Sequence, residues 1–77
     1  MHRDKPPDWV LARARAIGAQ IREARDAKGI TQQELAELIN RDVKSISRWE
    51  NAHRAPDLND LLLLAGGLDV PLAYLVR

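Results

Sequence analysis

Helix start and stop signals are concentrated in residues 31–51, and they constrain the fold of this chain more than any other feature. Thr31 and Glu34 have the Thr-x-x-Glu spacing of a capping box, which satisfies two backbone amides at the start of a helix. Asn40 tolerates the left-handed backbone conformation that ends a helix, and Asp42 can cap the next one. The pattern predicts two short helices joined by a tight turn, the first ending at Asn40 and the second beginning directly after Asp42.

Apolar residues recur at three- and four-residue steps along the rest of the chain, with no strand-like alternation. Asp8 predicts the cap of a long first helix that starts at Trp9, and Gly29 predicts its C-terminal end. A fourth helix is expected to weaken at a glycine pair, and residues 68–70 are expected to bridge to a short fifth helix. We therefore expect an all-α fold with five helices. The start and end signals of the last two are Asp57, Asp60, Gly66, Gly67 and Pro71.

The length of the chain, 77 residues, suits a single domain, here residues 8–77, and residues 1–7 are expected to form a flexible N-terminal arm. The chain has no cysteine, and His2 and His53 lie far apart, so we expect no metal site and no cofactor. No apolar run approaches the length of a membrane span, and residues 1–7 lack the apolar core of a secretory signal. The sequence therefore predicts a cytoplasmic protein with no membrane partner.

The net charge is only +1, but the charges are unevenly distributed along the chain. Up to Arg54 there are 11 lysines and arginines and 8 acidic residues, whereas from Ala55 onward there are one arginine and three aspartates. A basic body and a slightly acidic, leucine-rich tail indicate two surfaces with different partners.

Three sequence features together are specific: Thr-Gln-Gln-Glu-Leu-Ala at residues 31–36, Ser-Ile-Ser-Arg-Trp-Glu-Asn at residues 45–51, and the later Pro56. They closely resemble the Cro and lambda-type phage repressor family, often called the XRE type. The resemblance extends over residues 17–75, most of the chain. It implies a compact five-helix bundle of the lambda-repressor-like DNA-binding type, in which helices 2 and 3 form a helix-turn-helix. It also implies double-stranded DNA as the partner.

In that family the second of the two short helices lies in the major groove, which assigns residues 43–51 as the recognition helix. Lys44 and Arg48 are hydrogen-bond donors that suit the O6 and N7 acceptors of guanine, whereas Val43 offers apolar contact to a thymine methyl group. The alternative is an ordinary solvated basic face. The residues expected to contact bases are Val43, Lys44, Ser47 and Arg48.

Contacts to DNA phosphates are expected at both ends of the helix-turn-helix. Gln32 matches a family glutamine at a helix N-terminus, where free amides and the helix dipole favour an anion. Asn51 and Arg54 match the end of the recognition helix and the loop after it, and His53 is either a further contact or a loop histidine of no consequence. The expected phosphate-contacting residues are Gln32, Ser45, Asn51 and Arg54.

Three further residues are expected to be structural. Arg25 and Glu50 match a buried or partly buried ion pair that ties the first helix to the third in the family. The aromatic side chain of Trp49 could stack on a nucleobase, but packing in the core beside Ile46 is its expected role. Arg41 departs from the family, which has a small apolar residue there, and adds a cation near the turn.

Residues 61–64 are four consecutive leucines, which cover every direction around a helix, so at least one is expected to be exposed. Leu63 stands where the family usually has a lysine. An apolar patch of this kind predicts a two-fold homodimer through the fourth and fifth helices, with possible help from Trp9. Such a dimer presents two recognition helices roughly 34 Å apart to a palindromic operator. The candidate interface residues are Leu63, Leu72, Tyr74 and Leu75.

The leading hypothesis is a transcriptional regulator that binds operator DNA with sequence specificity. One alternative is an antitoxin or other regulator on the same fold that binds a protein partner such as a toxin, and another is an interaction module without DNA binding. No catalytic spacing and no glycine-rich phosphate loop is present, and the chain is too short to enclose a pocket. We therefore expect neither an enzyme nor a small-molecule ligand.

Overall fold

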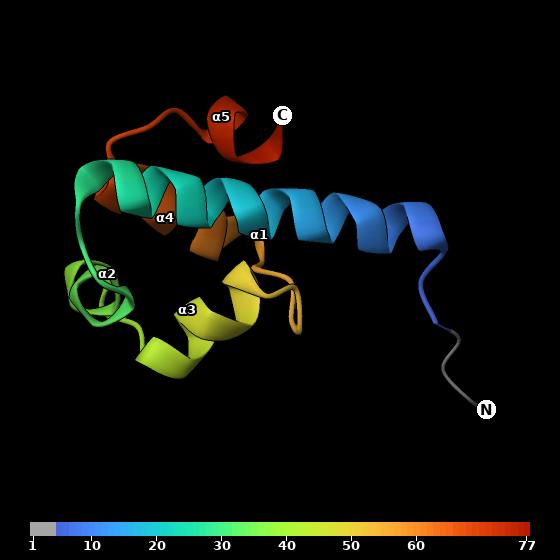
Figure 1. Cartoon of the computed structure of the whole chain (residues 1–77), viewed down its shortest axis with the longest axis horizontal. Helices are drawn as coiled ribbons and strands as arrows, with labels where there is room; N and C mark the ends of the chain where they lie inside the picture. Colours follow the sequence, from blue (N-terminus) through green and yellow to red (C-terminus); the bar gives the residue numbers. More distant parts are fainter. Residues whose placement is uncertain (1–4) are drawn as a thin grey trace.

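The computed structural model describes residues 5–77, and within that range it contains five helices and no strand (Figure 1). The predicted all-α, five-helix fold is confirmed. The long first helix runs across the molecule, with the second and third helices on one side of it and the fifth on the other (Figure 1). The helices are α1 (Asp8–Lys28), α2 (Gln32–Ile39), α3 (Val43–Glu50), α4 (Leu58–Leu68) and α5 (Leu72–Val76).

The start and stop signals around α2 and α3 act as the sequence predicts. The Thr31 hydroxyl accepts a hydrogen bond from the Glu34 amide at 3.0 Å, and the Glu34 carboxylate accepts one from the Thr31 amide at 2.8 Å. Asn40 ends α2 with a φ of 57°, in the left-handed region. The Asp42 carboxylate then caps α3 by accepting a hydrogen bond from the Ser45 amide at 2.8 Å. The turn between the two helices is therefore fixed by local chemistry at both ends.

The first helix begins one residue earlier than the sequence predicts. Pro7 occupies the N-cap position, and no side chain caps the helix, so the predicted Asp8 cap is wrong. Asp8 lies instead in the first turn of α1, where the helix dipole still favours an acidic side chain. Residues 1–4 of the predicted arm lie outside the described residues, and residues 5–7 are exposed.

The fourth helix ends later than the sequence predicts. It continues through Gly66 and Gly67 to Leu68, and Asp69, with a φ of 59°, forms its left-handed C-cap. A Cβ atom at Gly67 would lie 2.6 Å from Cγ2 of Ile39. This glycine therefore allows α4 to approach α2 closely, and packing between the helices outweighs its low helix propensity.

All five helices contribute side chains to one apolar core, and α4 packs against α1, α2 and α5. Trp49 is only 4% exposed, which confirms its predicted place in the core. Among residues 5–77, no helix combines the length and the apolar character needed to cross a bilayer. The buried core residues are Ile21, Ala24, Leu35, Ala36, Ile39, Ile46, Trp49, Leu64, Ala65, Leu68 and Leu75.

The short α5 is held against α1 by polar contacts to its last carbonyls. The Gln20 amide donates a hydrogen bond to the Leu75 carbonyl at 2.7 Å, and the Arg13 guanidinium donates to the carbonyls of Val76 and Arg77, each at 2.7 Å. Beyond this attachment the N-terminal half of α1 projects past the body of the molecule (Figure 1).

The leucine run in α4 divides between core and surface, as the sequence predicts. Leu64 is fully buried, whereas Leu62 and Leu63 are 50% and 37% exposed. One candidate for the dimer interface is wrong, because Leu75 is fully buried in the core and has no surface to offer a second chain. Two other candidates, Leu72 and Tyr74, are partly buried against the core.

Candidate nucleic-acid interface

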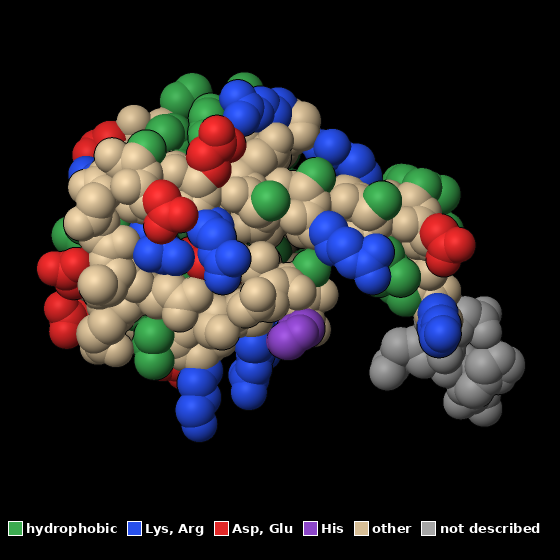
Figure 2. Space-filling view, viewed as in Figure 1, with side chains coloured by type: hydrophobic (Ala, Val, Ile, Leu, Met, Phe, Trp, Pro, Cys, Tyr) green, Lys and Arg blue, Asp and Glu red, His purple; other side chains and the backbone are tan. Residues whose placement is uncertain are grey.

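The two faces of α3 carry different kinds of side chain. Ile46, Trp49 and Glu50 are buried, whereas Lys44 and Arg48 are exposed. In the space-filling view, Lys and Arg side chains project from the lower edge of the molecule, on the side where α3 lies (Figure 2). The one acidic residue within α3 is therefore turned inward, and its cations are turned outward.

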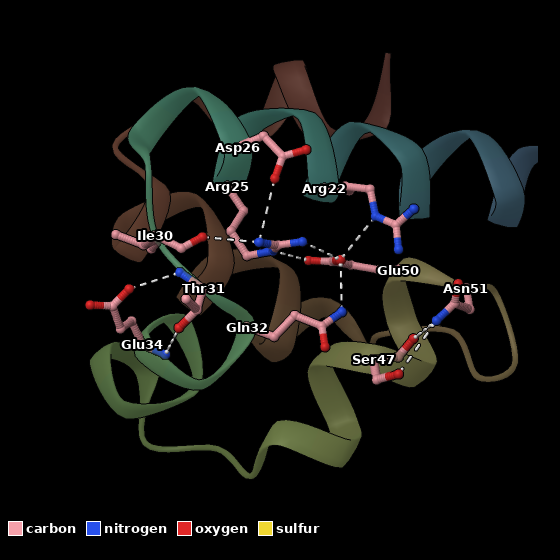
Figure 3. Close-up of polar contacts among 10 residues, drawn as sticks. All are labelled: Arg22, Arg25, Asp26, Ile30, Thr31, Gln32, Glu34, Ser47, Glu50 and Asn51. Carbon is pink, nitrogen blue, oxygen red and sulfur yellow. Dashed lines mark hydrogen bonds and ion pairs between the residues drawn. The ribbon is translucent and has the colours of Figure 1, made fainter.

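Glu50 is the centre of a polar cluster between α1, α2 and α3 (Figure 3). Its carboxylate accepts hydrogen bonds from Arg25 Nε at 2.7 Å and Arg25 Nη2 at 3.0 Å, and from Gln32 Nε2 at 3.0 Å. Arg22 Nε lies 3.4 Å away and adds a third donor residue. The Glu50 side chain is fully buried and that of Arg25 is 12% exposed. The paired donors are what make this burial tolerable, since an unpaired buried charge is costly.

The cluster keeps Glu50 ionised. Burial raises the pKa of this carboxyl, but hydrogen bonds from Arg25 and then from Gln32 outweigh that effect, and the pKa lies below its ordinary value. The hydrogen bond to Glu50 is also the main cause that raises the pKa of Arg25. The Arg25 guanidinium donates in addition to the Ile30 carbonyl at 2.9 Å, which ties the cluster to the connection before α2.

A close backbone approach sets α3 against α1. A Cβ atom at Gly18 would lie 2.5 Å from the Trp49 carbonyl oxygen and 2.7 Å from that of Glu50. Only glycine leaves room for these backbone atoms, so Gly18 fixes how near the C-terminal end of α3 lies to α1. The orientation of the exposed face of α3 follows from this contact and from the Glu50 cluster.

The structure places the predicted base-contacting residues on or near the exposed side of α3. Lys44 and Arg48 are exposed, and Ser47 is half-buried. Val43 packs partly against the core, so only part of its side chain is available to a ligand. These positions are consistent with base contact, which stays a prediction.

The predicted phosphate-contacting residues lie at the starts of α2 and α3 and at or beyond the end of α3. Gln32 begins α2 and is half-buried, with its amide bonded to Glu50, and Ser45 lies in the first turn of α3. The Asn51 amide donates to the Ser47 carbonyl at 2.9 Å, where it caps the end of α3. Arg54 and His53 are exposed in the connection to α4. Their contact with phosphate stays a prediction.

The structure changes the account of two arginines. Arg41 lies 3.3 Å from a carboxylate oxygen of Asp60 on α4, so the cation expected near the turn is paired with an acid. Arg22, for which the sequence predicts no role, joins the Glu50 cluster. Its three-residue spacing from Arg25 places both on one side of α1, and that spacing was the available signal.

Comparison with known proteins identifies the arrangement. A family model described as helix-turn-helix matches residues 21–75, most of the chain. The chain belongs to the XRE-type, Cro and C1-like helix-turn-helix family of DNA-binding proteins. The resemblance seen in the sequence is thereby confirmed, and the family consists of transcriptional regulators rather than enzymes.

Three relatives illustrate the likeness. The HTH-type transcriptional regulator ImmR of Bacillus subtilis is 36% identical over 61 residues, which cover 79% of this chain and 48% of that protein. The restriction-modification controller protein C.AhdI from Aeromonas hydrophila is 34% identical, with a TM-score of 0.80 over 83% of this chain and 97% of the other. The P22 c2 repressor, crystallised with a synthetic operator, is 30% identical, with a TM-score of 0.74 over 79% and 92% of the two chains. This chain therefore spans about half the length of its curated relative but nearly all of the controller protein.

Proposed function

We propose that this chain is a transcriptional regulator that binds double-stranded operator DNA with sequence specificity, with α3 in the major groove. The observation that carries the proposal is the division of charge on α3. Glu50 is buried among donors, while Lys44 and Arg48 are exposed on the opposite side. A helix with a neutralised inner face and a cationic outer face suits a polyanion whose groove admits one helix.

The residues proposed to contact DNA divide into two roles. Lys44 and Arg48, with Val43 and Ser47, are proposed to contact base edges, since Lys and Arg donors match the guanine acceptors in the major groove. Contacts from the ends of the helix-turn-helix to phosphates fix the register of the protein on the duplex. The residues proposed for phosphate contact are Gln32, Ser45, Asn51 and Arg54.

The relatives support an operator as the ligand. The P22 c2 repressor is a protein of this fold whose structure was determined with a synthetic operator. ImmR is a transcriptional regulator and C.AhdI a controller protein of a restriction-modification system. A repressor bound to an operator, a transcriptional regulator and a controller protein are thus all similar to this chain, and this supports the proposal.

We further propose that the chain acts as a homodimer. Leu62 and Leu63 expose apolar surface on α4, and Leu38 of α2, 58% exposed, lies beside them along an open groove of about 470 Å³. Burial of such a patch against a second copy would remove apolar area from water. The expected result is a dimer in sedimentation experiments at micromolar concentration; a monomer under these conditions, with and without DNA, would rule the dimer out.

The same patch also suits a different protein partner, which is the alternative function of an antitoxin-like regulator. The homodimer and the regulator with another protein partner differ in one measurable respect. A homodimer buries the leucines in the isolated protein, whereas a regulator with another partner leaves them exposed until that partner binds. Protection of Leu62 and Leu63 in the isolated protein, measured by their chemical shift changes on dilution, therefore favours the homodimer.

Selection of binding sites from random duplex DNA tests the proposed function. The expected result is one enriched sequence with two-fold symmetry and half-site centres roughly 34 Å apart, because each copy of α3 reads one half-site. Enrichment of a single unsymmetrical half-site would support sequence-specific DNA binding but contradict the proposed dimer. No enrichment over the starting pool would contradict sequence-specific binding.

A further inference from the structure

One cation on α1, Arg15, belongs neither to the Glu50 cluster nor to the contacts that hold α5 against α1. Arg15 is exposed, and within residues 5–77 it takes part in no hydrogen bond or ion pair. Its neighbour Arg13 is different, since it donates to the carbonyls of Val76 and Arg77 at the end of α5. The two arginines are only two residues apart but point to different sides of the helix.

Helix geometry shows which side Arg15 faces. It precedes Arg22 by seven residues, which in an α-helix brings two side chains to within roughly 20° of the same direction, about 10.5 Å apart along the axis. Arg22 points toward α3, because its Nε lies 3.4 Å from the Glu50 carboxylate. Gly18, which touches the last carbonyls of α3, lies between them in sequence. Arg15 therefore faces the side of the molecule on which α3 ends.

The same side holds the other exposed polar groups of the proposed interface. The connection that follows α3 carries His53 and Arg54, both exposed. Figure 2 shows a hollow between the body and the projecting part of α1, with Lys and Arg side chains along its upper edge and on the lower edge of the body. The segment before α1, residues 5–7, bends toward this side as well (Figure 1).

From this placement we infer that Arg15, on the projecting half of α1, contacts a backbone phosphate of the DNA held by α3, next to the phosphates contacted from the α3–α4 connection. The inference rests on the proposed function and adds a second anchoring point, remote from the recognition helix. A phosphate contact of this kind adds affinity for every sequence and does not discriminate between bases. It also adds about one released counterion to the salt dependence of binding.

The test compares R15A with a matched control, R77A. Arg77 is also an exposed arginine, but it lies at the end of α5, where it pairs with Glu23 at 3.2 Å, on the side of α1 away from α3. Both variants remove one positive charge, so a long-range effect of charge lowers the DNA affinity of both variants equally. The probes are the duplex selected from random DNA and a random-sequence duplex of the same length, each titrated at several salt concentrations.

For R15A we expect a slope of log affinity against log salt that is smaller by about one, with affinity reduced by the same factor on both duplexes. R77A should keep the wild-type slope. Ethylation of single phosphates should identify one position that weakens the wild type and not R15A. Equal slopes for the wild type and R15A, with binding retained, would overturn this inference alone. Absence of binding by the wild type to either duplex would overturn the proposed function as well.

Discussion

The inner and outer faces of α3 satisfy their charges in opposite ways. On the inner face, Glu50 is fully buried and its oxygens accept hydrogen bonds from Arg25, Gln32 and Arg22. On the outer face, Lys44 and Arg48 are exposed, and within residues 5–77 neither forms an ion pair. One short helix therefore carries a buried, paired acid on one side and exposed cations on the other. Changes on the inner face should alter stability, and changes on the outer face should alter binding.

The largest expected effect on stability comes from the centre of the inner face. Replacement of Glu50 by alanine leaves the Arg25 guanidinium, 12% exposed, without its main partner. Removal of one member of a buried ion pair costs about 3–5 kcal/mol, because the remaining charge stays away from water. Thermal and denaturant unfolding measure the loss. A melting temperature equal to that of the wild type would show that the Glu50 cluster does not stabilise the fold.

The glycine against which α3 packs should give the next largest effect. In G18A the new methyl group would lie 2.5 Å from the Trp49 carbonyl oxygen, so α3 must move away from α1. Overpacking of this kind costs about 1–3 kcal/mol. Gly66 is the matched control, because a Cβ atom there meets nothing within 4 Å, and G66A should stabilise α4 by up to about 1 kcal/mol. Equal effects of the two substitutions in denaturant unfolding would contradict the close approach.

Protonation of Glu50 should make the stability of the fold depend on pH in the acidic range. Its pKa is lowered in the folded state, so its contribution is fully present above the ordinary carboxyl pKa of about 4.5 and is lost as the pH falls through the folded value. The wild type should therefore lose stability steeply on acidification below about pH 4.5. E50Q should be less stable at neutral pH but lose less in this window. Parallel stability curves for the two proteins would contradict an ionised Glu50 in the fold.

The smallest effect on stability is expected on the outer face. Lys44 and Arg48 are exposed, so K44A and R48A should each change the free energy of unfolding by less than about 0.5 kcal/mol. Denaturant unfolding checks this directly. A decrease of about 2 kcal/mol or more in the free energy of unfolding of either variant would show that the residue stabilises the fold. The two faces of α3 would then not differ in the way described.

The sequence was sufficient for the local features of the helix-turn-helix, although the Asp8 cap of α1, also a local prediction, was wrong. The capping box of Thr31 and Glu34, the left-handed Asn40 and the Asp42 cap all come from residues within a few positions of one another, and all were predicted. The Glu50–Arg25 pair was found only through resemblance to a family, because its members lie on different helices. Local spacing carries no information about which distant acid a given arginine will meet.

Two features that the sequence predicted wrongly depend on contacts between helices. Gly66 and Gly67 predicted the end of α4, but packing of Gly67 against Ile39 keeps that helix intact. Leu75 was predicted at the surface, but α5 folds back on α1 and buries it. In both cases a tertiary contact that the sequence does not display decided the outcome.

One binding measurement tests most directly whether the outer face of α3 contacts bases while its inner face stabilises the fold. The affinity of the wild type and of the double variant K44A/R48A is titrated against the selected duplex and a scrambled duplex, with unfolding curves of both proteins as the control. The wild type should prefer the selected duplex by roughly a thousandfold or more. The double variant should lose most of that preference while its melting temperature stays within a few degrees of the wild type. A double variant that still distinguishes the two duplexes as well as the wild type would contradict base contact by α3.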